Sequence, residues 1–417
     1  MPMKLTFNPA PINPLFYETQ VSDWNSWNWQ IRNALKTKEQ FEKAFTLKDS
    51  EAAAFDNKNF QIQVTPYYAS LASDHPEDPI RKILMPQEKE LKVTYQQMLD
   101  PLGEKNNNPS PRIIHRYPDR LLFLVTDYCS VYCRYCTRKH FTGKEQVFPK
   151  ADEYQDGLDY IRKHTGIREV ILSGGDPLTL SDQRLLQVVK DLRQIEHVEI
   201  IRIGTRMPVV CPMRISESLV SELKKYGPIY FMLHFNHPKE ITKEARDAVS
   251  LLVDNGMPCF NQMVLLNGVN NDASIVQALS RRLLYLRVKP YYMFQCDPSE
   301  GTDHLRTSVE DSLQIQKDLW GNLSGLAMPN LSLDIPNGGG KTSYVPNFET
   351  FKDNNIRSYV GWDGISADYI SPLASEIKKP IDVSEYQAEW DSLKNAKLNS
   401  FQSGEFSDKG FQEIISE

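Results

Sequence analysis

Short apolar runs alternate with amphipathic stretches along the chain from residue 121 onward. The apolar or β-branched runs are expected to form buried strands at 121–126, 169–172, 198–203, 229–234, 259–266 and 288–293. The stretches between and after them repeat apolar residues at helical spacing and predict helices at 152–163, 181–193, 216–225, 239–254, 272–284 and 308–321. Continuous buried strands that alternate with helices are typical of a parallel sheet. The pattern therefore predicts an α/β fold, an incomplete parallel (β/α)6 barrel.

The two ends of the chain lack this alternation. Residues 1–110 are predicted to be a mostly helical N-terminal region, with helices at 30–36 and 39–47. Residues 111–346 would form the barrel. Residues 347–417 are polar and aromatic and end in a Lys- and Glu-rich sequence. We expect this last segment to be a C-terminal extension, either an arm on a partner subunit or a frayed tail.

The composition is that of a soluble globular protein with a sizeable core, since the 417 residues are 40% hydrophobic and 24% charged. The formal net charge of −6 argues against a nucleic-acid binder, which would carry a basic face. No apolar run approaches the ~20 residues of a membrane-spanning helix, and the N-terminus has no long apolar leader. Six cysteines are too sparse for a disulfide framework. A reducing, cytoplasmic location is therefore expected.

Cys129, Cys133 and Cys136 form a C-x3-C-x2-C motif directly after the first predicted strand. Three thiolates on one short loop can hold a [4Fe–4S] cluster and leave one iron without a protein ligand, which opens that iron to chemistry. Zinc is the alternative, with His140 as a fourth ligand, but this is not a common zinc-finger spacing. The motif therefore favours an iron–sulfur cluster over zinc or inert thiols. A non-catalytic iron–sulfur or zinc protein is the alternative class, and the Gly-Gly-Gly-Lys sequence at 338–341 argues against it.

Polar residues end or follow several of the predicted strands. They are the Ser-Gly-Gly-Asp-Pro sequence at 173–177, Thr205, Arg206, His234, Gln262 and Asp297. In parallel α/β folds the active site lies at the carboxyl ends of the strands. We therefore expect these residues and the cysteine loop to share one site.

These motifs and the incomplete barrel resemble those of radical S-adenosylmethionine enzymes, and more narrowly those of the lysine 2,3-aminomutase family. The resemblance runs from about residue 24 to residue 347, and its most specific segments are 115–120, 129–138, 290–297 and 334–342. It implies an isomerase, a 2,3-aminomutase that interconverts L-lysine and β-lysine. It also implies three cofactors: a [4Fe–4S] cluster, S-adenosylmethionine and pyridoxal 5′-phosphate (PLP).

By this resemblance, Lys341 is the residue that binds PLP covalently. The phosphate of PLP would be bound by Arg116, Tyr117 and Arg120. Glycines at 338–340 leave room for a large ligand, and two arginines suit a phosphate by charge and fork geometry. A phosphate-binding P-loop is excluded, because its pattern requires glycine at the position of Ile335. A solvated surface lysine and ordinary surface salt bridges remain the alternatives from the residues alone.

The resemblance also assigns residues to the cluster and to S-adenosylmethionine. The cluster ligands would be Cys129, Cys133 and Cys136. The methionine amino group of S-adenosylmethionine would be contacted by Ser173, Gly174, Gly175 and Asp176. His234 and Gln262 would approach the nucleoside part, although single His and Gln residues more often serve as hydrogen-bonded structure.

Three residues are candidates for substrate binding. Arg138 lies two positions past the last cysteine of the motif, and the resemblance assigns it to the substrate α-carboxylate, which fits bidentate recognition. Asp297 and Asp334 would hold the ε-ammonium group of lysine, whereas the related glutamate enzyme carries Lys and Asn there. Two carboxylates favour a cationic side chain, which leaves arginine or a protein lysine as alternative substrates. A structural role is also open, in which Asp297 caps the next segment and Asp334 ends a strand.

The resemblance further implies a homodimer or homotetramer and a reductase or flavodoxin-type electron donor. Some positions depart from the family pattern. No cysteine follows Cys296, so the zinc that some members bind between subunits is not expected. Asn337 replaces a glycine of the lysine segment, and asparagine tolerates the left-handed conformation. Asn267 and Asn271 also differ, and could change substrate fit or loop geometry.

Overall fold

The fold is built on one sheet of nine strands in the order β1 to β9. The computed structural model describes residues 5–56, 61–92, 94, 97–139, 142, 147–373, 375, 377 and 383. The strands are β1 (Ile113–Tyr117), β2 (Arg120–Thr126), β3 (Glu169–Gly174), β4 (Ile200–Thr205), β5 (Ile229–Leu233), β6 (Cys259–Leu265), β7 (Val288–Gln295), β8 (Asn330–Ile335) and β9 (Gly340–Ser343). Strands β2 to β8 are parallel, and the edge strands β1 and β9 are antiparallel to their neighbours. The predicted incomplete parallel barrel is therefore confirmed.

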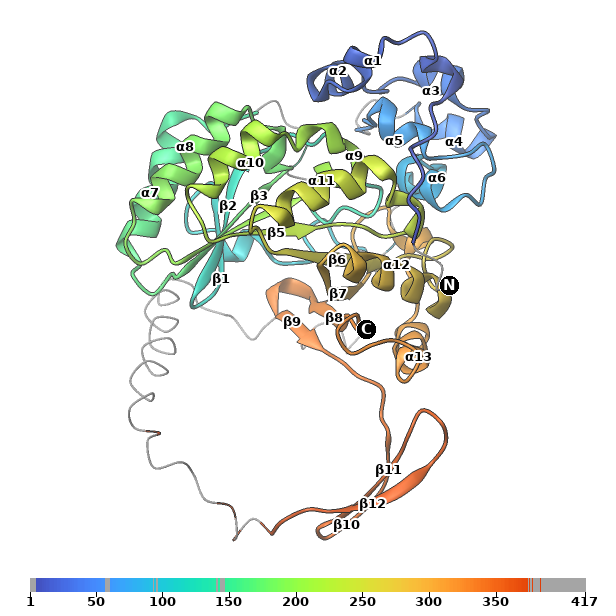
Figure 1. The fold of residues 1–417 in the computed structure, drawn as a ribbon, viewed down its shortest axis with the longest axis vertical. Coiled ribbons are helices and arrows are strands. Elements are labelled where there is room, and N and C mark those ends of the chain that lie inside the picture. Colours follow the sequence, from blue (N-terminus) through green and yellow to red (C-terminus); the bar gives the residue numbers. More distant parts are fainter. Residues whose placement is uncertain are drawn as a thin grey trace.

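Helices cover the outer face of the curved sheet (Figure 1). They are α7 (Ala151–Lys163), α8 (Asp182–Arg193), α9 (Met207–Val210), α10 (Glu217–Lys224), α11 (Lys243–Asp254), α12 (Ala273–Tyr285) and α13 (Val309–Leu319). Every helix predicted after residue 150 is present. Side-chain caps set several starts: Ser181 accepts from the backbone N–H of Arg184, and Thr242 accepts from that of Ala245. Apolar stripes of these helices pack on the buried face of the strands and form the core.

Burial alternates along β6 with a period of two, which shows how the strands present two faces. Cys259, Met263 and Leu265 are buried in the core. Gln262 and Val264 point the other way and line a cavity inside the barrel. The same alternation in neighbouring strands places polar side chains inside the barrel at the strand ends.

The two edge strands, β1 and β9, were not predicted. A first strand at 121–126 would leave Arg116, Tyr117 and Arg120 outside any strand, and this is wrong: the first two end β1 and the third begins β2, with Tyr117 paired to Arg120. At the other edge, β8 and β9 form an antiparallel hairpin that pairs Asp334 with Lys341. These short strands lack the long apolar runs that reveal the central ones.

The N-terminal region consists of short helices packed over the carboxyl ends of the strands (Figure 1). They are α1 (Val21–Trp24), α2 (Trp27–Arg32), α3 (Lys38–Ala44), α4 (Asp49–Ala54), α5 (Pro66–Ser70) and α6 (Pro79–Leu84). The helix predicted at 30–36 starts earlier, because Ser26 caps it, and ends at Arg32. Thr65 donates to the carbonyl of Val210, and Gln63 donates to the carbonyl of Cys129 at 2.7 Å. This region therefore closes over the cysteine loop.

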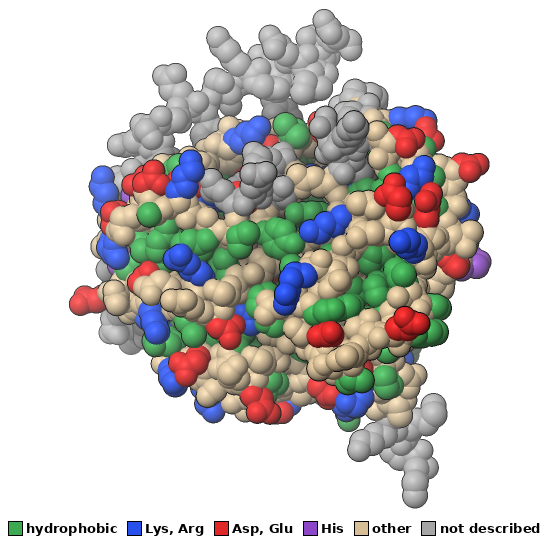
Figure 2. Space-filling model, turned by 90° about the horizontal axis from the view of Figure 1, so that it is seen from above, with side chains coloured by type: hydrophobic (Ala, Val, Ile, Leu, Met, Phe, Trp, Pro, Cys, Tyr) green, Lys and Arg blue, Asp and Glu red, His purple; other side chains and the backbone are tan. Residues whose placement is uncertain are grey.

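The C-terminal segment forms a separate antiparallel sheet that projects from the barrel (Figure 1). Its strands are β10 (Glu349–Asp353), β11 (Ile356–Val360) and β12 (Ser366–Ile370). Trp320, the residue after α13, and Phe348, the residue before β10, meet edge to face with ring centroids 6.3 Å apart. Acidic and basic side chains are interspersed on the face of the molecule shown in Figure 2. Within the described ranges, no helix combines the length and apolar character needed to cross a bilayer.

Candidate active site

A cavity of about 600 Å³ lies inside the barrel, between the cysteine loop, the ends of the parallel strands and the β8–β9 hairpin. Every residue that the family resemblance assigns to the site lines it. These are Arg116, Tyr117, Arg120, Cys129, Cys133, Cys136, Arg138, Ser173, Gly174, Gly175, Asp176, His234, Gln262, Asp297, Asp334 and Lys341. The volume is within the range of cavities that enclose small molecules.

The cysteine loop follows β2 and brings its three thiols to the cavity wall. Arg206 donates from Nη1 to Cys133 Sγ at 2.8 Å, and the backbone N–H of Arg138 donates to Cys136 Sγ at 3.3 Å. Burial raises the pKa of the Cys129 and Cys136 thiols. Metal ligation would ionise them, and the adjacent guanidinium would stabilise the resulting negative charge. This donor set fits an iron–sulfur cluster.

His140, the fourth ligand of the alternative zinc site, lies outside the described residues. Among the side chains that the structure describes, no three or more of His, Cys, Asp and Glu are arranged to hold a metal ion. Ligands of a cubane bind different iron atoms, so three cluster cysteines need not converge on one point.

Glycines at the end of β3 let this strand pack directly on the cysteine loop. Gly174 has a φ of +117°, and a Cβ on it would lie 2.2 Å from the carbonyl oxygen of Thr126. A Cβ on Gly175 would lie 2.2 Å from the carbonyl oxygen of Tyr128. Any side chain at either position would push the two loops apart.

The Asp176 carboxylate is held by protein groups in this structure. Its Oδ1 accepts from the Thr205 hydroxyl at 2.7 Å and from the backbone N–H of Leu178 at 3.0 Å. Its Oδ2 accepts from the backbone N–H of Arg206 at 2.7 Å. The carboxylate therefore ties the end of β3 to the end of β4. Burial raises its pKa.

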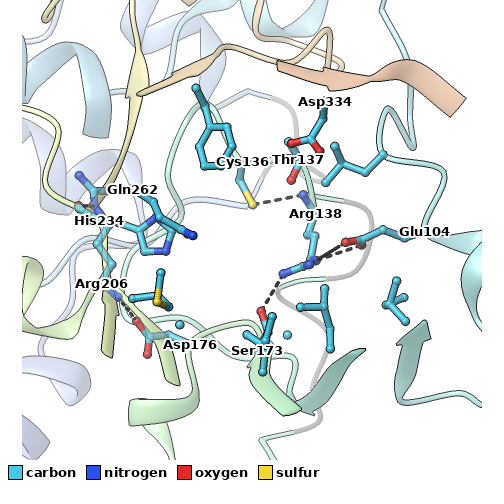
Figure 3. A pocket seen from close by; sticks show the side chains of 18 of the residues that line it. Glu104, Cys136, Thr137, Arg138, Ser173, Asp176, Arg206, His234, Gln262 and Asp334 are labelled. Carbon is cyan, nitrogen blue, oxygen red and sulfur yellow. Dashed lines mark hydrogen bonds and ion pairs between the residues drawn. The ribbon is translucent and has the colours of Figure 1, made fainter. Parts of the chain in front are cut away.

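His234 and Gln262 lie side by side on the wall opposite Glu104 (Figure 3). Burial, together with the positive charges of Arg206 and Arg138, lowers the pKa of His234 to about 4. The imidazole is therefore neutral at physiological pH and can offer one donor and one acceptor.

The β8–β9 hairpin presents Lys341 through a turn in the left-handed conformation. Asn337 has a φ of +62°, which confirms that asparagine accommodates the geometry expected of the glycine it replaces. The hairpin packs on the β1–β2 hairpin: the backbone N–H of Lys341 donates to the Tyr117 hydroxyl at 2.9 Å, and Arg116 Nη2 donates to the carbonyl of Gly339 at 2.9 Å. Lys341 is thereby placed beside the residues predicted to bind a phosphate.

A phosphate fits the surroundings of Arg116. Its Nε is buried and has no hydrogen-bond partner among the described residues. The Arg120 guanidinium stacks on the Tyr117 ring at 4.1 Å and pairs with Asp119 at 2.7 Å. A buried N–H without an acceptor is costly, so an anionic ligand at this position would stabilise the site.

Asp334 and Asp297, the two carboxylates predicted to bind a cation, lie in different surroundings. Asp334 accepts from Lys341 Nζ at 3.1 Å through both oxygens. Burial and, to a smaller extent, the nearby Asp334 carboxylate raise the pKa of Asp297 to about 7. A cation between them would offset both effects.

Arg138 and Arg206 have partners that sequence reasoning did not assign to the site. Arg138 forms an ion pair with Glu104, at 2.6 Å between Nη2 and Oε1 (Figure 3). Arg206 also donates to Glu240 Oε1 at 2.8 Å and to the Tyr68 hydroxyl at 2.7 Å. Arg206 follows a predicted strand, so its place at the site could be expected from the sequence. Nothing in the sequence around Glu104 indicates its contact with Arg138.

Known proteins match this chain over most of its length, and a family model matches its central part. The Radical SAM superfamily model matches residues 123–279, from β2 to α12. The L-lysine 2,3-aminomutase of Clostridium subterminale is 42% identical over 362 residues, which cover 86% of this chain and 87% of that protein. The L-lysine 2,3-aminomutase of Acetoanaerobium sticklandii is 42% identical over 360 residues, with the same two shares. The glutamate 2,3-aminomutase of Clostridioides difficile is 41% identical over 364 residues, covering 86% of each chain.

Proposed function

Since this chain belongs to the lysine 2,3-aminomutase family of the radical SAM superfamily, we propose that it moves the α-amino group of L-lysine to C3 to form β-lysine. It is an isomerase, not a non-catalytic metal protein. The observation that carries the choice of substrate is the pair Asp297 and Asp334 on the wall of the same cavity as Arg138. One guanidinium suits the α-carboxylate, and two carboxylates suit a cationic side chain. A carboxylate side chain such as that of glutamate would be repelled at the same place.

The cofactors can be assigned to residues of this chain. Cys129, Cys133 and Cys136 would hold a [4Fe–4S] cluster whose fourth iron is open to S-adenosylmethionine. Lys341 would hold PLP covalently, and the unpartnered Nε of Arg116 supports a phosphate beside it. When bound, the cluster and S-adenosylmethionine supply one-electron chemistry for removing and returning a hydrogen at C3, and PLP supplies a conjugated system across which the nitrogen can move.

The contribution of the protein is position, charge and exclusion of water. Arg138 and the aspartate pair would fix the two ends of lysine, so that C2 and C3 face the cavity interior. The neutral His234 and Gln262 would orient the nucleoside without adding charge. The N-terminal region, whose Gln63 donates to the carbonyl of Cys129 in the cysteine loop, would keep water from the reacting atoms.

The experiment that tests this function is a reconstituted assay. Protein purified without oxygen is supplied with iron, sulfide, PLP, S-adenosylmethionine and dithionite or a flavodoxin-type donor, and is then offered L-lysine, L-arginine or L-glutamate. β-Lysine that forms only with all components would establish the reaction. Preferred conversion of arginine, or cleavage of S-adenosylmethionine without a β-amino acid, would contradict the proposed substrate.

The affinity for lysine is expected to fall as the pH drops below about 7. The pKa of Asp297 is raised to about 7, so this carboxyl becomes protonated below that pH and loses its attraction for the ammonium group. If binding needs the carboxylate, KM for lysine should rise about tenfold between pH 8 and pH 6. Measurement of KM and kcat between pH 6 and pH 8 tests this prediction. In Asp297→Asn, KM should be high at every pH; a wild-type pH profile in this variant would contradict the assignment.

We also propose that β10–β12 is covered by a second copy of the chain. A three-stranded sheet without a packed face is marginal in water, and Trp362 and Ile370 are 64% and 68% exposed. Light scattering coupled to gel filtration should find a dimer or larger oligomer. Ile370→Glu should shift the protein toward monomer, whereas Lys352→Glu on the opposite face should not. A wild-type protein that is monomeric at all concentrations would overturn this arrangement.

A further inference from the structure

Glu104 binds the edge of the Arg138 guanidinium that Nε and Nη2 form. Arg138 Nε donates to both Glu104 oxygens at 2.9 Å, and Nη2 donates to Oε1 at 2.6 Å. Ser173 accepts from Nη1 at 2.8 Å. We infer that Glu104 is a positioning residue that presents Arg138 to the carboxylate of the substrate. This inference rests on the proposed function, in which Arg138 binds that carboxylate.

The place of Glu104 is set by backbone contacts rather than by the ion pair alone. The backbone N–H groups of Glu104 and Lys105 donate to the two carboxylate oxygens of Asp100 at 3.0 and 2.9 Å. Gly103 has a φ of +59°, and a Cβ on it would lie 2.6 Å from the backbone of Asn337. The segment that carries Glu104 is therefore packed on the turn that presents Lys341. It connects the carboxylate-binding arginine to the hairpin of the proposed PLP lysine.

The remaining hydrogen-bond donors of Arg138 match one further carboxylate. A guanidinium has five N–H groups. Glu104 uses the one on Nε and one on Nη2, and Ser173 uses one on Nη1. One N–H is left on each terminal nitrogen, which is the pair that a second carboxylate could accept from in a bidentate manner. Glu104 thus leaves the binding edge of Arg138 free while restricting its rotation.

Charge explains why Arg138 needs such a partner. The Arg138 side chain is only 18% exposed and that of Glu104 only 9%. The backbone N–H of Arg138 also donates to Cys136 Sγ at 3.3 Å, so this side chain starts directly beside the cysteine loop. Without the Glu104 carboxylate, the guanidinium would keep the Ser173 hydroxyl as its partner in the described residues and would be freer to rotate away from the substrate. The effect of losing Glu104 should therefore be specific for ligands that carry an α-carboxylate.

The test compares L-lysine with L-lysinamide, which differ only in that the amide replaces the α-carboxylate. Holoenzyme is titrated with each, and binding is followed by the absorbance change of PLP when the ligand amine replaces Lys341. In Glu104→Gln, the Kd for L-lysine should rise about tenfold or more, since a hydrogen bond between charged groups is lost. The Kd for L-lysinamide should change less than about twofold. Iron and PLP contents, measured on the same samples, should equal those of the wild type.

A matched control and a second variant complete the design. Glu153→Gln removes a carboxylate that pairs with Arg112 at 2.8 Å outside the cavity, and it should bind both ligands normally. If Glu104→Gln does not fold, Glu104→Asp keeps the charge and should show a smaller loss for L-lysine alone. Equal weakening of both ligands, or tighter binding of L-lysine in Glu104→Gln, would overturn the inference. A wild-type protein that binds neither ligand would instead overturn the proposed function.

Discussion

Replacing Cys129, Cys133 or Cys136 with alanine is expected to prevent assembly of the iron–sulfur cluster. Each thiolate would ligate a different iron, and the cluster already has one iron without a protein ligand. Loss of one thiolate would leave a second iron without a protein ligand, and should lower bound iron from about four atoms per chain to near zero. Cleavage of S-adenosylmethionine and formation of β-lysine should both fall below detection. Iron and sulfide analysis, with the visible absorbance and the electron paramagnetic resonance spectrum of the reduced protein, measures the effect.

A buried cysteine elsewhere provides the matched control. Cys259 lies on the helix-facing side of β6 and is 2% exposed. Cys259→Ala removes one sulfur from the core, which should cost about 1 kcal/mol of stability, as other small core truncations do. Its cluster should be intact. A Cys133→Ala protein with full iron content and activity would show that the ligands are not these three.

Replacing Lys341 is expected to remove the covalent attachment of PLP while leaving the cluster in place. A neutral lysine amine is the nucleophile that such an attachment requires. In Lys341→Ala, the near-visible absorbance of lysine-bound PLP should be absent, β-lysine should be undetectable, and iron should remain at the wild-type level. Spectra of the reconstituted protein and iron analysis measure both parts of the prediction.

Lys341→Arg is the matched variant for this position. It keeps a positive charge beside Asp334, which pairs with Lys341 at 3.1 Å in the unmodified protein. Arginine stays protonated in proteins and does not act as an amine nucleophile. We expect normal folding and iron content but no covalent PLP. Borohydride reduction followed by peptide mapping would identify another lysine if the attachment lay elsewhere, and that result would refute the assignment.

The sequence alone was sufficient to predict the central fold. Long apolar runs and helical periodicities are local signals, so strands β2 to β7 and the helices between them could be located within a few residues. Because the carboxyl ends of parallel strands meet at one edge, the polar residues at those ends could be expected to share a site. Closely spaced cysteines and the glycines before Lys341 could be recognised without any tertiary information. The polar residues at the strand ends, the three cysteines, Gly340 and Lys341 line the same cavity.

The tertiary structure decided what depends on contacts between distant parts of the chain. The edge strands β1 and β9 are short and lack a long apolar run, so only pairing with their neighbours defines them. The ion pair of Arg138 with Glu104 spans 34 positions, and the contact of Arg206 with Cys133 spans 73. Neither follows from spacing, because both depend on how the N-terminal region and successive strands pack. The sequence by itself determined which chemical groups are present at the site, and only packing decided which of them are paired and which can meet a ligand.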